Sequence, residues 1–256
     1  MDLTWLIWVN NLTKRVLDIL ISFIAIVACI PLITYIAVAI KCESPGPVLF
    51  RQIRLGKHGR RFWIYKFRKF YTLGSHDLAL TLNNDSRMTS FGNALQKTKL
   101  DELPQLWNVL RGNMSMVGPR PETIDFADCF RRGYEQVLQY KPGIFGPNQV
   151  FFRNESELFC REMDPETYYR EVIFGLKARV DLAYLKKATI FTDLLLMVRG
   201  SIIVVFPGLL PASNEKLLRD VEEWIQKPSL VRLLFHAACS KSNESSRQSI
   251  TTLERQ

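Results

Sequence analysis

An uncharged apolar run, Ile19 to Ile40, constrains the fold of this chain more than any other feature. Its 22 residues include no Asp, Glu, Lys or Arg. At 1.5 Å per residue, a helix of that length covers the hydrocarbon core of a bilayer, which is about 30 Å thick. The run therefore predicts a helix that lies in a membrane.

Two features of this run favour a bend over a straight span. Pro31 stands inside it, and a proline within a helix removes a hydrogen bond and favours a kink. Basic residues also flank both ends, namely Lys14, Arg15, Lys41, Arg51, Arg54 and Lys57. Because basic flanks favour the cytoplasmic side, neither end is selected for export. A helix that enters and leaves the same face accommodates both features, and a true span is the alternative.

The positive charge is concentrated in the first half of the chain. The net charge is +9, and residues 1–120 hold 16 Lys and Arg against 7 Asp and Glu, whereas the remainder holds 18 of each. This distribution favours anionic ligands or anionic lipid near the first half. Nucleic acid is the competing partner, but basic recognition helices and aromatic stacking motifs are not evident. The five cysteines form no CxxC or metal spacing, which indicates reduced thiols in a cytosol-facing protein.

The segment from Leu100 to Pro121, LDELPQLWNVLRGNMSMVGPRP, carries the strongest chemical pattern. Pro104 predicts a helix that begins near Asp101, because proline is tolerated in the first turn. Taken alone, Asp101 and Glu102 are most simply an acidic helix cap. Neighbouring side chains on a helix diverge by about 100°, so both carboxylates can face one metal only where the backbone departs from a helix. Beyond the helix, a stiff segment presents Arg120.

The remaining elements follow from turn residues and periodicity. Residues 48–55 and 60–67 have strand composition on either side of a glycine-containing turn, which predicts a hairpin. A solvated hairpin, whose charges only keep an edge soluble, is the alternative reading of its basic residues. We expect one helix over 122–140, mostly helix over 164–191, an amphipathic helix over 214–238, and a polar tail over 240–256.

The segment that contains Asp101, together with the basic hairpin, closely resembles the signature of the bacterial sugar transferases, the monotopic phosphoglycosyl transferases. The resemblance covers about Lys14 to Val205. It implies a mixed, helix-rich α/β fold around a re-entrant membrane helix broken at Pro31, with amphipathic helices on the bilayer surface. We accordingly expect an anchor and re-entrant helix over 1–43, a catalytic domain over 44–205, and a C-terminal extension over 206–256.

The chemistry that this resemblance implies is transfer of a sugar-1-phosphate from a nucleotide diphosphate sugar, expected to be a UDP-sugar, to polyprenyl (undecaprenyl) phosphate. Asp101 would be the nucleophile, Glu102 the second carboxylate, and Mg²⁺ would bridge Asp101 and the diphosphate, with UMP as leaving group. The candidate phosphate-binding residues are Arg51, Arg54, Lys57, Lys66, Arg68, Arg87 and Arg120. The implied location is the cytoplasmic face of a bacterial inner membrane. Membrane lipid is an expected partner and nucleic acid is not, while a second copy or a downstream glycosyltransferase is left open.

Several residues depart from the family pattern. Lys69 and Phe70 stand where relatives have a small residue and methionine, and Phe145 stands where they have threonine. Gln96 stands where they have arginine, so one cation is missing, and Lys99 is the candidate to compensate. These departures keep an alternative open: a relative of low activity that binds lipid phosphate or a partner glycosyltransferase.

Overall fold

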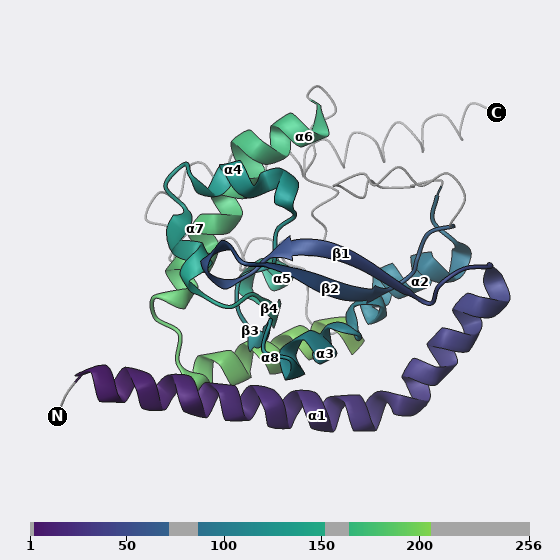
Figure 1. Ribbon diagram of the computed structural model, residues 1–256, viewed down its shortest axis with the longest axis horizontal. Helices are drawn as coiled ribbons and strands as arrows, with labels where there is room; N and C mark the ends of the chain where they lie inside the picture. Colours follow the sequence, from purple (N-terminus) through teal and green to yellow (C-terminus); the bar gives the residue numbers. More distant parts are fainter. Residues whose placement is uncertain (1–2, 72–86, 152–163, 206–256) are drawn as a thin grey trace, which may run out of the picture.

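The computed structural model describes residues 3–71, 87–151 and 164–205. Both predicted C-terminal segments lie outside these ranges. The fold is helix-rich with two small sheets, as the sequence predicted (Figure 1). Its elements are α1 (Leu3–Glu43), β1 (Leu49–Leu55), β2 (Arg61–Phe67), α2 (Ser90–Thr98), α3 (Gln105–Leu110), β3 (Ser115–Val117), α4 (Ala127–Phe130), β4 (Gly143–Phe145), α5 (Pro147–Phe151), α6 (Pro165–Tyr168), α7 (Phe174–Leu185) and α8 (Ile190–Val205).

Helix α1 contains the whole apolar run. Within the described residues, Leu12–Glu43 is a helix long and apolar enough to cross a membrane. Figure 1 shows α1 running along one side of the fold and turning toward the β1–β2 hairpin in its last part. Pro31 lies inside the helix and lacks the N–H that would complete the backbone ladder, which accounts for a bend.

The first half of α1 is tied to the rest of the fold by polar side chains. Arg15 donates to the Val109 and Leu110 carbonyls at 2.7 and 2.8 Å, which satisfies acceptors at the C-terminus of α3. Lys14 forms an ion pair with Asp193 of α8. The basic flank that the sequence suggested would face the cytoplasm thus binds other elements of the protein.

A buried carboxylate adds a further link between α1 and β3. Asp18 is buried and accepts hydrogen bonds from the Ser115 hydroxyl at 3.1 Å and the Met116 N–H at 2.9 Å. One turn further along α1, the Ser22 hydroxyl donates to the Asp18 backbone carbonyl at 2.6 Å. A charged residue near the start of an apolar helix is therefore explained by its backbone and hydroxyl donors.

The second half of α1 contacts the same domain. Ile36 and Ile40 are buried in a cluster with Phe67 of β2 and Leu95 of α2. Beyond the helix end, the Arg68 guanidinium donates to the Ser44 and Pro45 carbonyls; the bond to Ser44 is 2.7 Å long. Both ends of α1 are therefore bound to one folded unit.

The hairpin was predicted correctly. Strands β1 and β2 pair antiparallel from Leu49 opposite Phe67 to Leu55 opposite Arg61. Since directly opposed residues share a face, Gln52, Arg54 and Lys66 point to one side of the hairpin.

The second sheet requires glycine at two positions. Strands β3 and β4 run parallel, and their backbones approach so closely that a Cβ on Gly118 would lie 2.2 Å from the Lys141 carbonyl oxygen. A Cβ on Gly143 would lie 2.1 Å from the Gly118 nitrogen. The Gly118 N–H donates to the Phe145 carbonyl at 2.9 Å. This contact fixes the chain immediately before Arg120.

The predicted single helix over 122–140 was wrong. The chain forms a 3₁₀ turn over Ile124–Phe126, the short α4, and a second 3₁₀ turn over Glu135–Gln139. Gly133, at φ +94°, adopts a left-handed conformation that ends helical geometry between them. The apolar positions are nevertheless buried, because successive short turns still direct them inward; they are Phe126, Cys129, Phe130 and Val137. The helical prediction for 164–191 is confirmed by α6, α7 and the start of α8, with a π-helical turn over Tyr169–Ile173.

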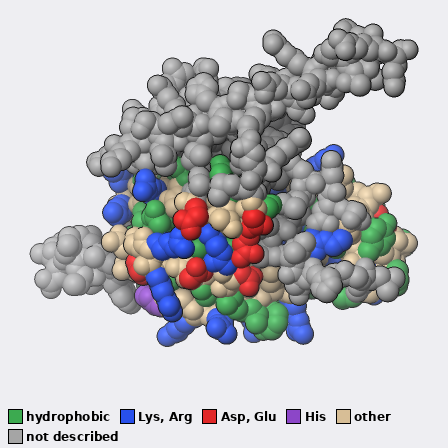
Figure 2. All heavy atoms as spheres, turned by 90° about the horizontal axis from the view of Figure 1, so that it is seen from above, with side chains coloured by type: hydrophobic (Ala, Val, Ile, Leu, Met, Phe, Trp, Pro, Cys, Tyr) green, Lys and Arg blue, Asp and Glu red, His purple; other side chains and the backbone are tan. Residues whose placement is uncertain are grey.

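Two faces of the molecule differ in polarity. Helices α1, α3 and α8 lie on one side, where large apolar side chains are exposed; we call this the apolar face (Figure 1). Its exposed residues include Phe23, Ile24, Val27, Tyr35, Val38, Trp107, Phe191, Leu195 and Val198, with Phe191 75% exposed. The opposite side carries α4 and α6, and Figure 2 shows Lys, Arg, Asp and Glu side chains gathered on its described part. Arg170, for example, pairs with Asp128 at 2.7 Å and Glu166 at 2.8 Å.

A buried polar network lies beneath α7. The Lys177 ammonium lies 2.9 Å from the Tyr169 hydroxyl and 3.3 Å from the Glu122 carboxylate. Asp181, one turn further along α7, is also buried, and its Oδ1 has no hydrogen-bond partner among the described residues. Burial raises the pKa of Asp181 to about 8, although Lys177 acts to lower it. Asp181 is therefore protonated at neutral pH.

This protonation predicts a pH-dependent stability. An unfolded aspartate has a pKa near 3.9, so between about pH 4 and 8 the folded state holds a proton that the unfolded state has lost. The contribution of Asp181 to stability must then fall as pH rises through that window, by at most about 1.4 kcal/mol per pH unit. Asp181→Asn removes this dependence. We expect the thermal midpoint of the variant, measured in detergent, to rise relative to that of the native protein as the pH increases from 5 to 8.

Asp125→Asn, at an exposed position, is the matched control and should track the native protein. A difference between Asp181→Asn and the native protein that stays constant over the same pH range would show that Asp181 is ionised in both states.

Candidate active site

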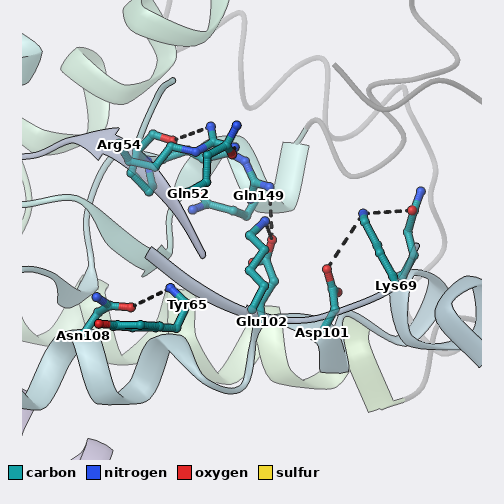
Figure 3. Close-up of polar contacts among 12 residues, drawn as sticks. Gln52, Arg54, Tyr65, Lys69, Asp101, Glu102, Asn108 and Gln149 are labelled. Carbon is teal, nitrogen blue, oxygen red and sulfur yellow. Dashed lines mark hydrogen bonds and ion pairs between the residues drawn. The ribbon is translucent and has the colours of Figure 1, made fainter. Parts of the chain in front are cut away.

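The acidic pair lies in a tight turn between two helices. Lys99 ends α2 in the left-handed conformation at φ 58°, and Leu100–Glu102 then forms one turn of 3₁₀ helix. The α-helix itself begins only at Gln105, with Pro104 as its N-cap. The predicted departure from α-helical geometry at the pair is thus confirmed, although the helix begins later than predicted. Figure 3 shows Asp101 and Glu102 projecting to the same side of the chain.

Glu102 is held by two cations. Lys66, in β2, lies 3.0 Å from its Oε1, and Arg120, which follows β3, lies 3.1 Å from the same oxygen. Burial alone would raise the pKa of Glu102, but Lys66, Arg120 and Lys99 hold it well below its ordinary value. Glu102 is therefore an ionised carboxylate whose charge is already compensated by the protein.

Asp101 has a different environment. Its side chain is buried, and its Oδ1 has no hydrogen-bond partner among the described residues. Its Oδ2 lies 3.9 Å from the Lys69 ammonium, which is too long for a hydrogen bond (Figure 3). Burial raises the pKa of Asp101, and the neighbouring Glu102 charge acts in the same direction. Asp101 therefore keeps a buried oxygen without a partner among the described residues, whereas Glu102 is bound by two cations.

Sequence reasoning missed Lys69 as a site residue and treated it only as a departure from the family pattern. Its ammonium lies 3.0 Å from the Gln96 side-chain oxygen, so two of the noted departures contact each other. Burial lowers the pKa of Lys69 to about 8, although Asp101 acts to raise it. The usable signal was a lysine placed directly after the strand that carries Lys66.

Lys99, the residue expected to compensate for the uncharged Gln96, also lies in the field of the acidic pair. Burial lowers its pKa, as does Arg120, while Glu102 and Asp101 act to raise it.

Some predicted phosphate-binding residues converge on this site. Lys66 and Arg120 contact Glu102 directly, as described above. Arg54 shares the hairpin face of Lys66 and donates to the Pro121 carbonyl at 3.2 Å and to Gln52 at 2.7 Å. It therefore supports the backbone of the segment that presents Arg120.

Other predicted residues are used elsewhere. Arg51 lies on the opposite hairpin face, with its guanidinium 5.0 Å from the Trp63 ring centroid. Lys57 is exposed in the hairpin turn, at the end of β2 away from Lys66.

The remaining two lie nearer to Lys69 along the chain. The Arg68 guanidinium donates to the Ser44 carbonyl just after α1, so it has a structural role. Arg87 lies 5.0 Å from the Phe70 ring centroid. A phosphate-binding role for Arg51, Lys57, Arg68 and Arg87 stays a prediction.

The arrangement suits a polyanionic ligand. Four cations surround two carboxylates, so the cluster keeps a net positive charge; they are Lys66, Lys69, Lys99 and Arg120. Charge-assisted hydrogen bonds from such cations are the usual means of binding phosphate oxygens. The vacant Oδ1 of Asp101 also offers a hard oxygen ligand of the kind that Mg²⁺ prefers. Among the described residues no group of three or more His, Cys, Asp and Glu could hold a metal, so substrate oxygens and water would complete such a site.

Comparison with known proteins agrees with this geometry. The bacterial sugar transferase family matches residues 9–207. A UDP-glucose:undecaprenyl-phosphate glucose-1-phosphate transferase of Klebsiella pneumoniae is 34% identical over 80% of this chain and 42% of its own length. Its Escherichia coli K12 counterpart is 37% identical over 73% of this chain and 39% of its own. A UDP-N-acetylgalactosamine-undecaprenyl-phosphate N-acetylgalactosaminephosphotransferase of Aeromonas hydrophila is 46% identical over 54% of this chain and 33% of its own.

This chain spans only about two fifths of the length of the first two relatives. The family match, over residues 9–207, includes the acidic pair, the hairpin and most of helix α1. Since the family match extends over well more than half of the sequence, this chain belongs to the bacterial sugar transferase family.

Proposed function

We propose that this protein transfers a sugar-1-phosphate from a UDP-sugar to undecaprenyl phosphate and releases UMP. The names of the relatives describe reactions of this type. The observation that carries the proposal is the unequal pair of carboxylates. Glu102 is neutralised by Lys66 and Arg120, whereas Asp101 keeps an unpartnered oxygen within the same cluster of cations.

In the proposed first step, a carboxylate oxygen of Asp101 attacks the phosphorus that bears the sugar. The bond from that phosphorus to the bridging oxygen breaks, and UMP leaves with that oxygen. In the second step a phosphate oxygen of undecaprenyl phosphate attacks the same phosphorus and frees Asp101. Lys66, Lys69, Lys99 and Arg120 stabilise the charge on the transferring group throughout.

Mg²⁺ fits this site, and we propose that it binds with the donor. Asp101 would hold it through its vacant oxygen, and Glu102 is the neighbouring carboxylate. Bound there, Mg²⁺ would neutralise charge on the diphosphate. The residues around it would orient the donor and exclude water.

We further propose that α1 is re-entrant, so that both of its ends and the active site lie on the cytoplasmic side. The support comes from contacts at both ends of the helix. Arg15 and Asp18 bind α3 and β3, while Ile36 and Ile40 pack on β2 and α2. A helix that crossed the bilayer would place its ends about 30 Å apart on opposite sides, out of reach of one domain.

The apolar face would then lie in the membrane. It brings the exposed side chains of α1, α3 and α8 to one side, while the ion pairs near Arg170 lie on the other. An apolar surface of this extent marks a membrane or protein contact. A lipid-linked phosphate acceptor meets the enzyme at the same boundary, with its chain in the bilayer and its phosphate at the surface.

The alternative is a binding protein of low activity, and it was suggested by residues that depart from the family pattern. The contacts of two of these residues weaken the case for it. Phe145 is partly buried against the core, and a Cβ on Gly200 of α8 would lie 2.7 Å from its ring. Gln96 binds Lys69, which supplies a cation beside Asp101. Release of UMP in the presence of membranes and undecaprenyl phosphate distinguishes the two functions.

The topology can be tested with single cysteines. One variant keeps only Cys42, which is exposed at the end of α1, and a second carries only Asn10→Cys. We expect a membrane-impermeant thiol reagent to label neither in intact cells and both after permeabilisation. Labelling of Asn10→Cys from outside, with Cys42 protected, would establish a spanning helix. Pro31→Leu should restore the missing hydrogen bond and shift α1 toward that spanning form.

The mechanism can be tested by isolating the covalent enzyme. Incubation with labelled donor and Mg²⁺, without lipid acceptor, should yield about one phosphosugar per active chain, trapped by acid quench and mapped to Asp101. Asp101→Asn keeps the size of the side chain but removes the nucleophile. Its turnover should fall by more than about 10³-fold, since losing one stabilising group alone costs about 10²–10³.

The exposed Asp125→Asn is the matched control and should retain activity. If the native enzyme turns over normally, forms no adduct and requires both substrates bound together, Asp101 is not a nucleophile and the transfer is direct.

A further inference from the structure

Lys69 differs from Lys66 and Arg120 in its hydrogen-bond partner. Lys66 and Arg120 each bind a carboxylate oxygen of Glu102 directly, at 3.0 and 3.1 Å. The Lys69 ammonium instead binds the neutral Gln96 amide oxygen at 3.0 Å and stands 3.9 Å from Asp101 (Figure 3). A neutral acceptor orients an ammonium without cancelling its charge.

The backbone around Lys69 is also fixed. Its carbonyl accepts from the Thr89 N–H at 3.0 Å, immediately before α2 begins. Gly92, in the first turn of α2, approaches so closely that a Cβ there would lie 2.1 Å from the Lys69 carbonyl oxygen. The helix that packs against Lys69 also supplies Gln96. One element therefore sets both the position of the lysine and the direction of its side chain.

This geometry leaves the ammonium available. A lysine has three N–H donors, and among the described residues one bond, to Gln96, uses one of them and leaves two. At 3.9 Å the charge stabilises the Asp101 carboxylate but occupies neither of its oxygens with a hydrogen bond. The side chain is 17% exposed, so the ammonium is mostly but not wholly withdrawn from water.

We propose that Lys69, oriented by Gln96, is the cation that binds the phosphoryl oxygens of the group transferred to Asp101, a role distinct from that of the cations that hold Glu102. This inference rests on the proposed function, because it assumes that Asp101 receives that group. It assigns Gln96 as a positioning residue. A carboxylate at position 96 would neutralise the ammonium, and a second cation there would repel it.

The experiment compares variants of the full chain in detergent. Lys69→Met removes the charge at similar length, and Lys69→Arg keeps it. Gln96→Arg adds a cation beside Lys69, and the double variant Lys69→Met/Gln96→Arg supplies the charge from α2 instead. The readouts are steady-state turnover by UMP release, the affinity for UDP as a probe of phosphate binding, and the thermal midpoint. Lys97→Met, an exposed lysine next to Gln96, is the matched control.

We expect Lys69→Met to lose about 10²–10³-fold in kcat and about tenfold or more in UDP affinity, with an unchanged thermal midpoint. Gln96→Arg alone should lose activity because two cations then crowd one position. The double variant should recover to within about tenfold of the native enzyme, and Lys69→Arg should recover further. A structural role for Lys69 would not produce recovery from a cation introduced on a different element.

Activity of Lys69→Met within threefold of the native enzyme would overturn the proposal. So would recovery in neither Lys69→Arg nor the double variant, because the loss would then not depend on the charge. A native protein that releases no UMP from any UDP-sugar, yet binds UDP in a Lys69-dependent manner, would refute the proposed reaction and leave this cation site standing.

Discussion

Two adjacent carboxylates withdrawn from water repel each other and lose hydration, and this constraint organises the centre of the fold. Glu102 is stable because β2 supplies Lys66 and the segment after β3 supplies Arg120. That segment is in turn fixed by the close approach of Gly118 to β4 and by the bonds of Arg54. Removing Lys66 or Arg120 would leave the buried Glu102 charge with one direct cation instead of two.

The same constraint explains why the two carboxylates can have different roles. Because compensation is concentrated on Glu102, Asp101 keeps a raised pKa and a vacant oxygen. Under the proposed function, an incoming diphosphate with Mg²⁺ would complete the charge balance around Asp101. Pairs of titratable groups whose environments drive their pKa values apart are a common basis for division of labour in active sites.

Local sequence patterns predicted the parts of the fold that depend on local forces. The hairpin followed from turn residues and strand composition, and the non-helical turn at Asp101 followed from the divergence of neighbouring helical side chains. The prediction of one helix over 122–140 was wrong because apolar spacing indicates which residues are buried but not whether the helix is continuous. Gly133 interrupts the helical geometry there.

Local sequence patterns could not predict contacts between residues that are far apart in the sequence. The motif alone does not distinguish Arg68, which caps α1, from Lys66, which binds Glu102. The difference arises because Lys66 lies within β2, whereas Arg68 follows the end of that strand and donates to the chain just after α1. Lys69 was missed because its partners, Gln96 and Asp101, are about thirty residues away and meet it only through the packing of α2.

The bonds from Arg15 to the last carbonyls of α3 have a mechanical consequence. Helix α3 has six residues, so it is only about 9 Å long, and the acidic turn lies at its other end. A displacement of α1 can therefore be transmitted to Asp101 through this short helix. Bilayer thickness acts on the depth and tilt of a membrane helix, so under the proposed function the lipid composition would influence how Asp101 is aimed.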